Sequence, residues 1–166
     1  MANIHQAVLI GASVEKVYHA ITSQEGLSGW WTPGVEAKAI VNSIARFPFG
    51  DEYFKKMEIT ELKPFESVKW NCLNGDDEWV GTSLSFELLG SEAQALSNSH
   101  PEVRGQLEQQ ANTEVTLLIF QHNNWKKETL MFAECSYTWG QFLCSLKLLC
   151  ESGKGRPWPH QHQVEK

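Results

Sequence analysis

The sequence predicts an α+β fold in which a curved antiparallel β-sheet wraps around one long C-terminal α-helix. Short segments of alternating apolar residues, roughly six in number, occupy most of residues 3–123 and are separated by turn sequences. One long amphipathic segment follows them and ends near Ser152. An antiparallel sheet has to bury one face, and this helix is the only element large enough to cover it.

The N-terminal part predicts one strand followed by two short helices. Residues 3–10 have the composition of a strand, and Ser13 is a suitable N-cap for the helix that follows. Apolar residues recur there at helical spacing, namely Val14, Val17, Tyr18 and Ile21. The stretch "GLSGWWTPG" then indicates a second, short helix that ends in a turn beyond Trp30 and Trp31.

The middle of the chain predicts antiparallel strands joined by tight turns. Proline places a turn at residues 63–65, and "NGDDE" at 74–78 is a strong hairpin signal. Residues 91–111 are polar and predict an excursion between two strands, in which Pro101 can open a short helix. Both phases of residues 112–123 are apolar in the centre, which predicts a central strand covered on both faces.

The C-terminal part predicts the long helix and a short tail. The helix should begin between Thr129 and Thr138 and end at Gly153, a residue typical of helix C-termini. Trp158 is expected to anchor the chain after the helix. We therefore expect a single domain over residues 1–159 and a solvated tail over 160–166, where two histidines in "HQH" make a poor metal site.

Composition and charge exclude several classes of protein. The chain has 166 residues and a net charge of −6, with no cluster of Lys or Arg, so a nucleic-acid partner is not expected. No apolar run reaches the roughly 20 residues of a membrane span, and the N-terminus is a poor signal peptide. The four cysteines form no C-x-x-C pair and are expected as reduced thiols in a cytoplasmic protein. No metal or other cofactor is expected.

Three stretches of the chain resemble one known family. They are "VEKVYHAIT…EGLSGWW" at residues 14–31, "ITELKPFESVKW" at 59–70 and "WGQFLCSLKLLCESGKGRPWP" at 139–159. They are similar to the activator of the heat-shock protein 90 ATPase, in the START-related, polyketide-cyclase-like (SRPBCC) superfamily. The resemblance implies the helix-grip fold, with a deep apolar pocket between sheet and helix. Members of that superfamily bind lipids, sterols, hormones or polyketides, and a minority catalyse ring closure or dehydration.

Aromatic and aliphatic residues of the predicted strands and helices are the candidates to line such a pocket, although each can equally be ordinary core. The candidates are Trp30, Trp31, Phe47, Phe49, Trp70, Phe86, Phe120, Trp139, Phe142, Leu143 and Leu146. Arg46 lies within an apolar strand. It is either a polar group in the pocket, able to hold a carboxylate or phosphate, or a residue of the outer face, which alternation favours.

Three functions remain open from the sequence. The first is a binding protein for a hydrophobic or amphipathic small molecule, which a fully packed space between sheet and helix would exclude. The second is a cyclase or dehydratase with polar groups inside the cavity, for which the candidates are Arg46, Tyr53, Glu58 and His122. The third is a co-chaperone or stress-related module that binds a chaperone. A homodimer is possible. The acidic residues of the turns, such as Asp76, are expected to be solvated.

Overall fold

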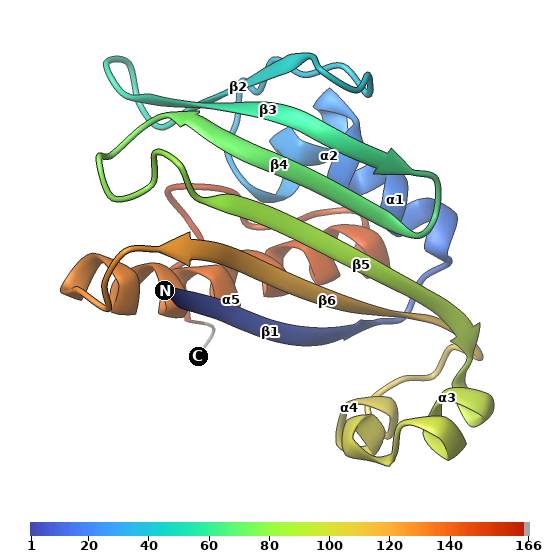
Figure 1. Cartoon of the computed structure of the whole chain (residues 1–166). Coiled ribbons are helices and arrows are strands. Elements are labelled where there is room, and N and C mark those ends of the chain that lie inside the picture. Colours follow the sequence, from blue (N-terminus) through green and yellow to red (C-terminus); the bar gives the residue numbers. More distant parts are fainter. Residues whose placement is uncertain (165–166) are drawn as a thin grey trace.

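The computed structural model describes residues 1–164 and contains one six-stranded antiparallel sheet in the order β1-β6-β5-β4-β3-β2. The strands are β1 (Ala2–Ile10), β2 (Ile44–Pro48), β3 (Phe54–Lys63), β4 (Ser67–Asn74), β5 (Ser83–Glu92) and β6 (Glu114–Trp125). The helices are α1 (Val14–Thr22), α2 (Gln24–Trp30), α3 (Ala93–Ser99), α4 (Arg104–Leu107) and α5 (Leu130–Ser152), with a 3-10 turn η1 (Pro101–Val103). The sheet curves around α5, and α1 and α2 lie on the same side of the sheet as α5 (Figure 1). The predicted α+β helix-grip fold is confirmed.

Local signals in the sequence explain where the first two helices begin. The Ser13 hydroxyl accepts a hydrogen bond from the Lys16 amide at 3.2 Å and caps α1. Ser23 caps α2 in the same way through the Gly26 amide at 2.9 Å. A side chain at Gly26 would place its Cβ 2.6 Å from the backbone oxygen of Ala20. Glycine therefore allows α2 to turn sharply against the end of α1.

Helix α5 runs from Leu130 to Ser152 on the concave face of the sheet. Thr129 caps its start by accepting a hydrogen bond from the Phe132 amide at 3.3 Å. Its end agrees with the sequence prediction, because Gly153 adopts the left-handed conformation with φ of 87°. The buried residues of α5 are Cys135, Trp139, Phe142, Leu143, Ser145, Leu146 and Cys150.

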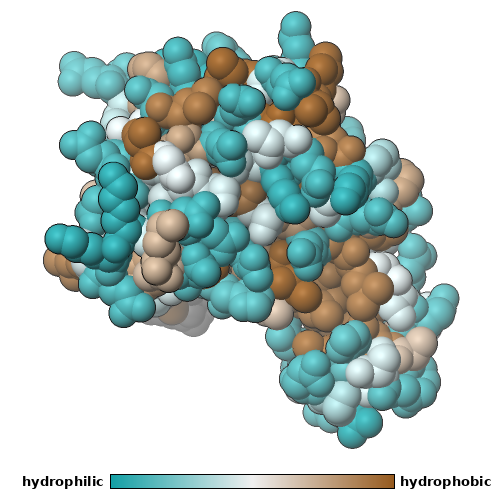
Figure 2. All heavy atoms as spheres, viewed as in Figure 1, coloured by the Kyte–Doolittle hydropathy of each residue, from teal (hydrophilic) through white to brown (hydrophobic). Residues whose placement is uncertain are grey.

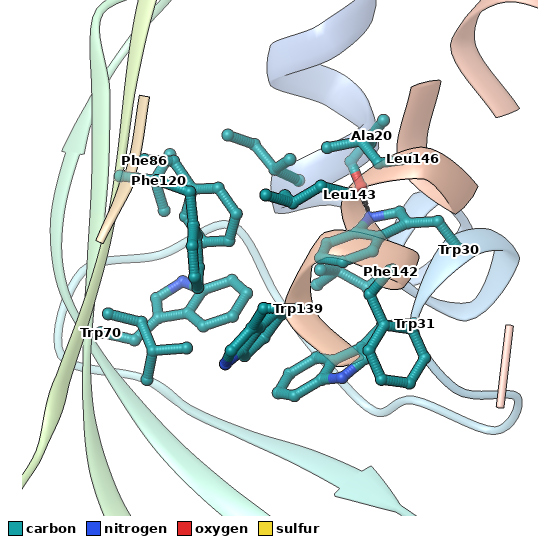
Figure 3. Close-up of a cluster of buried hydrophobic side chains, with 14 of the residues drawn as sticks. Ala20, Trp30, Trp31, Trp70, Phe86, Phe120, Trp139, Phe142, Leu143 and Leu146 are labelled. Carbon is teal, nitrogen blue, oxygen red and sulfur yellow. Dashed lines mark hydrogen bonds between the residues drawn. The ribbon is translucent and has the colours of Figure 1, made fainter. Parts of the chain in front are cut away.

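A continuous set of aromatic rings fills the centre of the space between the sheet and α5 (Figure 3). Trp31 lies 6.0 Å from Trp70 and 5.2 Å from Trp139 between ring centroids. Phe120 bridges Trp139 at 4.5 Å and Phe86 at 5.2 Å. All five rings are buried. Most of the predicted hollow between sheet and helix is therefore occupied by the protein's own side chains.

The predicted excursion covers part of the outer face of the sheet. Leu96 of α3 and Val103 of η1 are buried against Leu9, Val115 and Leu117 of the strands. This second cluster explains why both phases of the last strand are apolar, since its beginning is covered from both sides. In this view of the outer face, hydrophobic side chains gather on the sheet beside the α3–α4 segment and along the edge near β2 and β3, with hydrophilic residues between these two regions (Figure 2).

Residues 1–164 also show whether a helix could span a membrane and in which state the cysteines are. Among them no helix combines the length and the apolar content that crossing a membrane requires. The four cysteines are free thiols, three of them buried, while Cys144 is exposed.

Candidate ligand pocket

One cavity remains open between the sheet and the N-terminal half of α5, and we call it the Lys55 pocket. Its volume is about 260 Å³. Its lining residues come from β3, α5, the loops around them and the C-terminal segment, and are Trp31, Phe49, Lys55, Asp76, Trp79, Met131, Glu134, Cys135, Thr138, Trp139, Phe142, Trp158, Gln161 and His162. The space between sheet and helix is thus not fully packed.

Five aromatic residues form one connected series around this pocket. Trp158 contacts Phe49 at 5.9 Å, and Phe49 contacts Trp31 at 5.6 Å between ring centroids. The series continues from Trp31 to Trp139, and then from Trp139 to Trp79 at 6.0 Å. Such walls are suited to a flat or ring-containing molecule, because aromatic groups gain from offset and edge-to-face contacts.

Lys55 provides the buried cation of the pocket. It shares the inward phase of β3 with Met57 and Ile59, and only 7% of its surface is exposed. Its Nζ lies 4.2 Å from the ring centroid of Trp79, 4.5 Å from Tyr53 and 5.1 Å from Phe49. Burial lowers the pKa of this amine, while the nearby carboxylate of Asp76 acts in the opposite direction.

A short chain of hydrogen bonds links Lys55 to solvent through Tyr53 and Asp76. The Lys55 Nζ donates to the Tyr53 hydroxyl at 2.7 Å, and that hydroxyl donates to Asp76 Oδ2 at 2.8 Å. The backbone amide of Asp76 also donates to the Tyr53 oxygen at 3.0 Å. Burial first, and then the Asp76 carboxylate, raises the pKa of the Tyr53 hydroxyl, which keeps it protonated.

The C-terminal segment closes one side of the pocket. The Trp158 amide donates to the Trp31 carbonyl at 2.8 Å, and the Arg156 amide donates to the buried Ser145 hydroxyl at 2.6 Å. These bonds hold Gln161 at the pocket wall with 8% of its surface exposed. The expectation of a solvated tail therefore does not hold at Gln161.

Gln161 leaves one polar atom without a partner. Its Oε1 is buried and meets no hydrogen-bond donor among residues 1–164, while its Nε2 lies 3.1 Å from a ring nitrogen of His162. A buried carbonyl oxygen without a donor is unfavourable by about 1–3 kcal/mol. This oxygen is consequently a candidate acceptor for a donor group that enters the pocket.

His122 lies in the core beside the pocket and is fully used by its neighbours. Its Nδ1 accepts from the Trp139 indole N–H at 3.1 Å, and its Nε2 lies 2.8 Å from the Thr82 hydroxyl. That hydroxyl itself donates to the Trp79 carbonyl at 2.6 Å, so it has to accept from His122 Nε2–H. Burial lowers the pKa of His122 to about 3. Both ring nitrogens are occupied, so this imidazole has no free position for acid–base chemistry.

The predicted lining residues divide into two groups. Trp31, Phe49, Trp139 and Phe142 line the Lys55 pocket. The remaining seven lie within the packed core or its aromatic cluster and are Trp30, Phe47, Trp70, Phe86, Phe120, Leu143 and Leu146.

The polar residues considered for catalysis lie on different sides of the sheet. Arg46 lies on the outer face of β2, where its guanidinium carbon is 4.4 Å above the Phe54 ring. Glu58 shares that outer phase on β3, while Tyr53 accepts a hydrogen bond from the pocket-lining Lys55. The turn at residues 74–78 is present, but Asp76 is only partly solvated, because it bonds to Tyr53 and pairs with Lys55 at 3.8 Å.

Sequence reasoning missed the two polar groups that matter most in this pocket. Lys55 had a usable signal, since alternation puts it in phase with Met57 and Ile59. Gln161 had none, because its position depends on how the chain returns after α5. In residues 1–164, no three His, Cys, Asp or Glu side chains gather in a metal-binding arrangement.

A curved sheet closed over one long helix, with a cavity between them, defines a helix-grip protein of the SRPBCC type. The chain belongs to the family described as activator of Hsp90 ATPase homolog 1-like protein, whose profile matches residues 11–151. No curated protein matches the sequence.

Solved structures agree with this assignment. The Aha1 dimer from Colwellia psychrerythraea is 32% identical, with a TM-score of 0.73, over 93% of this chain and 100% of that chain. CalU16 from Micromonospora echinospora is 14% identical, with a TM-score of 0.60, over 89% of this chain and 73% of that one. DynU16, described as a putative protein in the dynemicin biosynthetic locus, is 19% identical, with a TM-score of 0.65, over 92% of this chain and 48% of that one. The last two similarities concern the fold alone.

Proposed function

We propose that this protein binds a small, ring-containing amphipathic molecule in the Lys55 pocket. The observation that carries the proposal is a cavity that joins aromatic walls to a buried donor, Lys55, and a buried acceptor without a partner, Gln161 Oε1. Ligand sites typically combine an apolar surface with a few placed polar groups in this way.

The volume and charge of the pocket narrow the class of molecule. About 260 Å³ is slightly below the usual range for drug-sized ligands, which favours one or two rings over a long acyl chain. Asp76 and Glu134 line the pocket together with Lys55, so its carboxylates outnumber its ammonium group. A neutral carbonyl oxygen facing Lys55 is therefore favoured over a carboxylate, which those two acidic residues would repel.

The test uses 4-hydroxyacetophenone, which carries a carbonyl acceptor at one end of a ring and a hydroxyl donor at the other. Calorimetric titration should detect saturable binding to the wild-type protein and weaker binding of 4-hydroxybenzoate, the anionic analogue. Thr138→Trp should fill the pocket and weaken binding more than about tenfold. Tyr137→Trp is the matched control, because Tyr137 is the preceding residue of α5 and is 66% exposed.

Two results of the titrations would count against binding in the Lys55 pocket. Equal affinity of the Thr138→Trp and Tyr137→Trp proteins would mean that the probe binds elsewhere. Binding of neither compound to the wild-type protein would contradict the proposal. Ring-closing chemistry ranks behind binding, because three of its four sequence candidates do not serve the cavity: His122 has no free ring nitrogen, and Arg46 and Glu58 lie on the outer face of the sheet.

A chaperone partner is the second candidate function. It is supported by the 32% identity to an Aha1 protein across nearly the whole chain and by the family description. The same relative was solved as a dimer, which supports a homodimer for this chain. Light scattering after size exclusion tests the dimer, and stimulation of Hsp90 ATP hydrolysis tests the partner. A monomeric mass and an unchanged ATPase rate would dismiss them. The four free thiols suit a cytoplasmic site of action.

A further inference from the structure

Lys55 and Lys56 are adjacent lysines in opposite surroundings. Lys56 is exposed on the outer face of β3, whereas Lys55 faces the pocket and is almost completely buried. Burial removes the water that stabilises an ammonium ion, and it therefore favours the free amine more at Lys55 than at an exposed lysine. An amine that is desolvated in an apolar pocket is the form in which lysine acts as a nucleophile.

The hydrogen-bonded chain beside Lys55 offers a route for its proton. The Lys55 Nζ donates to Tyr53, and Tyr53 donates to Asp76, whose side chain is 44% exposed. A proton that leaves the ammonium group can pass to the Tyr53 oxygen while the Tyr53 proton passes to the Asp76 carboxylate. The free amine is then left at the wall of the cavity.

We propose that Lys55 forms an imine with an aldehyde or ketone bound in the Lys55 pocket. This inference rests on the proposed binding function and adds a covalent step to it. A bound carbonyl group that faces Lys55, in a ligand whose own donor group faces Gln161 Oε1, lies beside Lys55, the only lysine among the pocket-lining residues.

The step balances without an oxidant or reductant. The amine lone pair attacks the carbonyl carbon, the carbonyl π electrons move to oxygen, and a proton passes from nitrogen to oxygen to give a carbinolamine. The proton held on Asp76 returns through Tyr53 to the hydroxyl group, the C–O bond breaks, and water leaves. The net change joins an ammonium and a carbonyl to give an iminium ion and one water.

The surroundings of Lys55 suit the product as well as the amine. The positive charge of the iminium ion stays among the rings of Trp79, Tyr53 and Phe49, whose faces attract cations. The thiol of Cys135 is another nucleophilic side chain that lines the pocket. Burial raises its pKa to about 11, which keeps it protonated and unreactive.

The experiment treats the full-length protein with 4-hydroxybenzaldehyde and sodium cyanoborohydride near neutral pH, followed by peptide mass mapping. The borohydride adds hydride to the iminium carbon and leaves a stable hydroxybenzyl-lysine. We expect Lys55 to be modified at least about tenfold faster than Lys56, and modification to persist in Lys56→Arg. Tyr53→Phe should slow modification of Lys55 without changing the modified residue.

The comparison of Lys55 with Lys56 is made within wild-type protein, so it does not depend on the stability of a variant. Modification of Lys55 no faster than Lys56 would overturn the imine proposal. If 4-hydroxyacetophenone still binds in that case, the binding function stands alone. If neither binding nor selective modification is found, both proposals fail together.

Discussion

Neutral His122 in the core makes the stability of this protein sensitive to mild acid. The imidazole is fully buried, accepts from Trp139 and donates to Thr82, so a second proton on Nδ1 would face the indole N–H. The pKa of His122 is therefore held near 3 in the folded protein, against an ordinary value of 6.5 in the unfolded chain. As pH falls below 6.5, the unfolded chain takes up a proton that the folded protein does not.

The sign and size of the effect follow from these two values. Burial favours the neutral form of His122, so its pKa is lower in the folded protein than in the unfolded chain. As pH falls, protonation of His122 stabilises the unfolded chain but not the folded protein, and the free energy of unfolding therefore decreases. Between about pH 8 and pH 5 the loss from His122 alone is about 2 kcal/mol, with a slope approaching 1.4 kcal/mol per pH unit. The loss continues until the pH approaches 3, where the folded protein is also protonated.

Urea unfolding followed by tryptophan fluorescence at several pH values between about 8 and 5 measures the effect. His122→Asn is the matched variant, because its side-chain oxygen can still accept from Trp139 but does not titrate. The variant should be less stable than the wild type at about pH 8, and the difference should shrink by about 2 kcal/mol at about pH 5. Parallel curves for the two proteins would refute the reasoning, since all other titrating groups are shared.

Four other substitutions, one of them a control, test the core packing, the anchor of the C-terminal segment and the end of α5. Trp70→Leu removes a fully buried ring from the aromatic cluster and should lower the free energy of unfolding by about 3 kcal/mol in urea titrations. A loss below about 1 kcal/mol would contradict the tight packing of this ring. Ser145→Ala removes the acceptor of the Arg156 amide and should cost about 1–3 kcal/mol. Hydrogen exchange of that amide should accelerate, and unchanged protection would argue against the anchor. Gly153→Ala places a side chain at a residue whose φ is 87°, and it should lower the free energy of unfolding by about 1 kcal/mol in a thermal scan. Gly105→Ala is the control, because open space surrounds that position, and it should be neutral or slightly stabilising in the same scan.

Sequence patterns predicted the elements well because their signals are local. The cap at Ser13, the stop at Gly153 and the alternation of the strands depend on neighbours within a few residues. The apolar character of both phases in the centre of residues 112–123 also correctly indicated a strand covered on both faces. Its cover is the α3–η1 segment, which the sequence indicated only as a polar excursion.

The pocket was harder to place, because its position depends on which side chains fill the hollow first. Trp30, Trp70 and Phe120 were as reasonable a set of candidates as Trp31 and Trp139 by pattern alone. Their rings occupy the centre of the hollow, so that only the region near Lys55 remains open. Side-chain volume and ring packing across α2, β4, β6 and α5 decide this, and neither is encoded in the period of any single segment.

The sequence by itself determined the architecture, the family and most of the apolar residues that face the interior, because hydrophobic period, capping and turn chemistry act over short distances along the chain. Only the tertiary structure decided which interior residues remain accessible to another molecule. Lys55 meets Asp76 through Tyr53 across a hairpin, and Gln161 reaches the same cavity because Trp158 and Ser145 fold the chain end back over α5. Contacts between residues so distant in sequence form only when the whole domain packs, and it is these contacts that create the pocket.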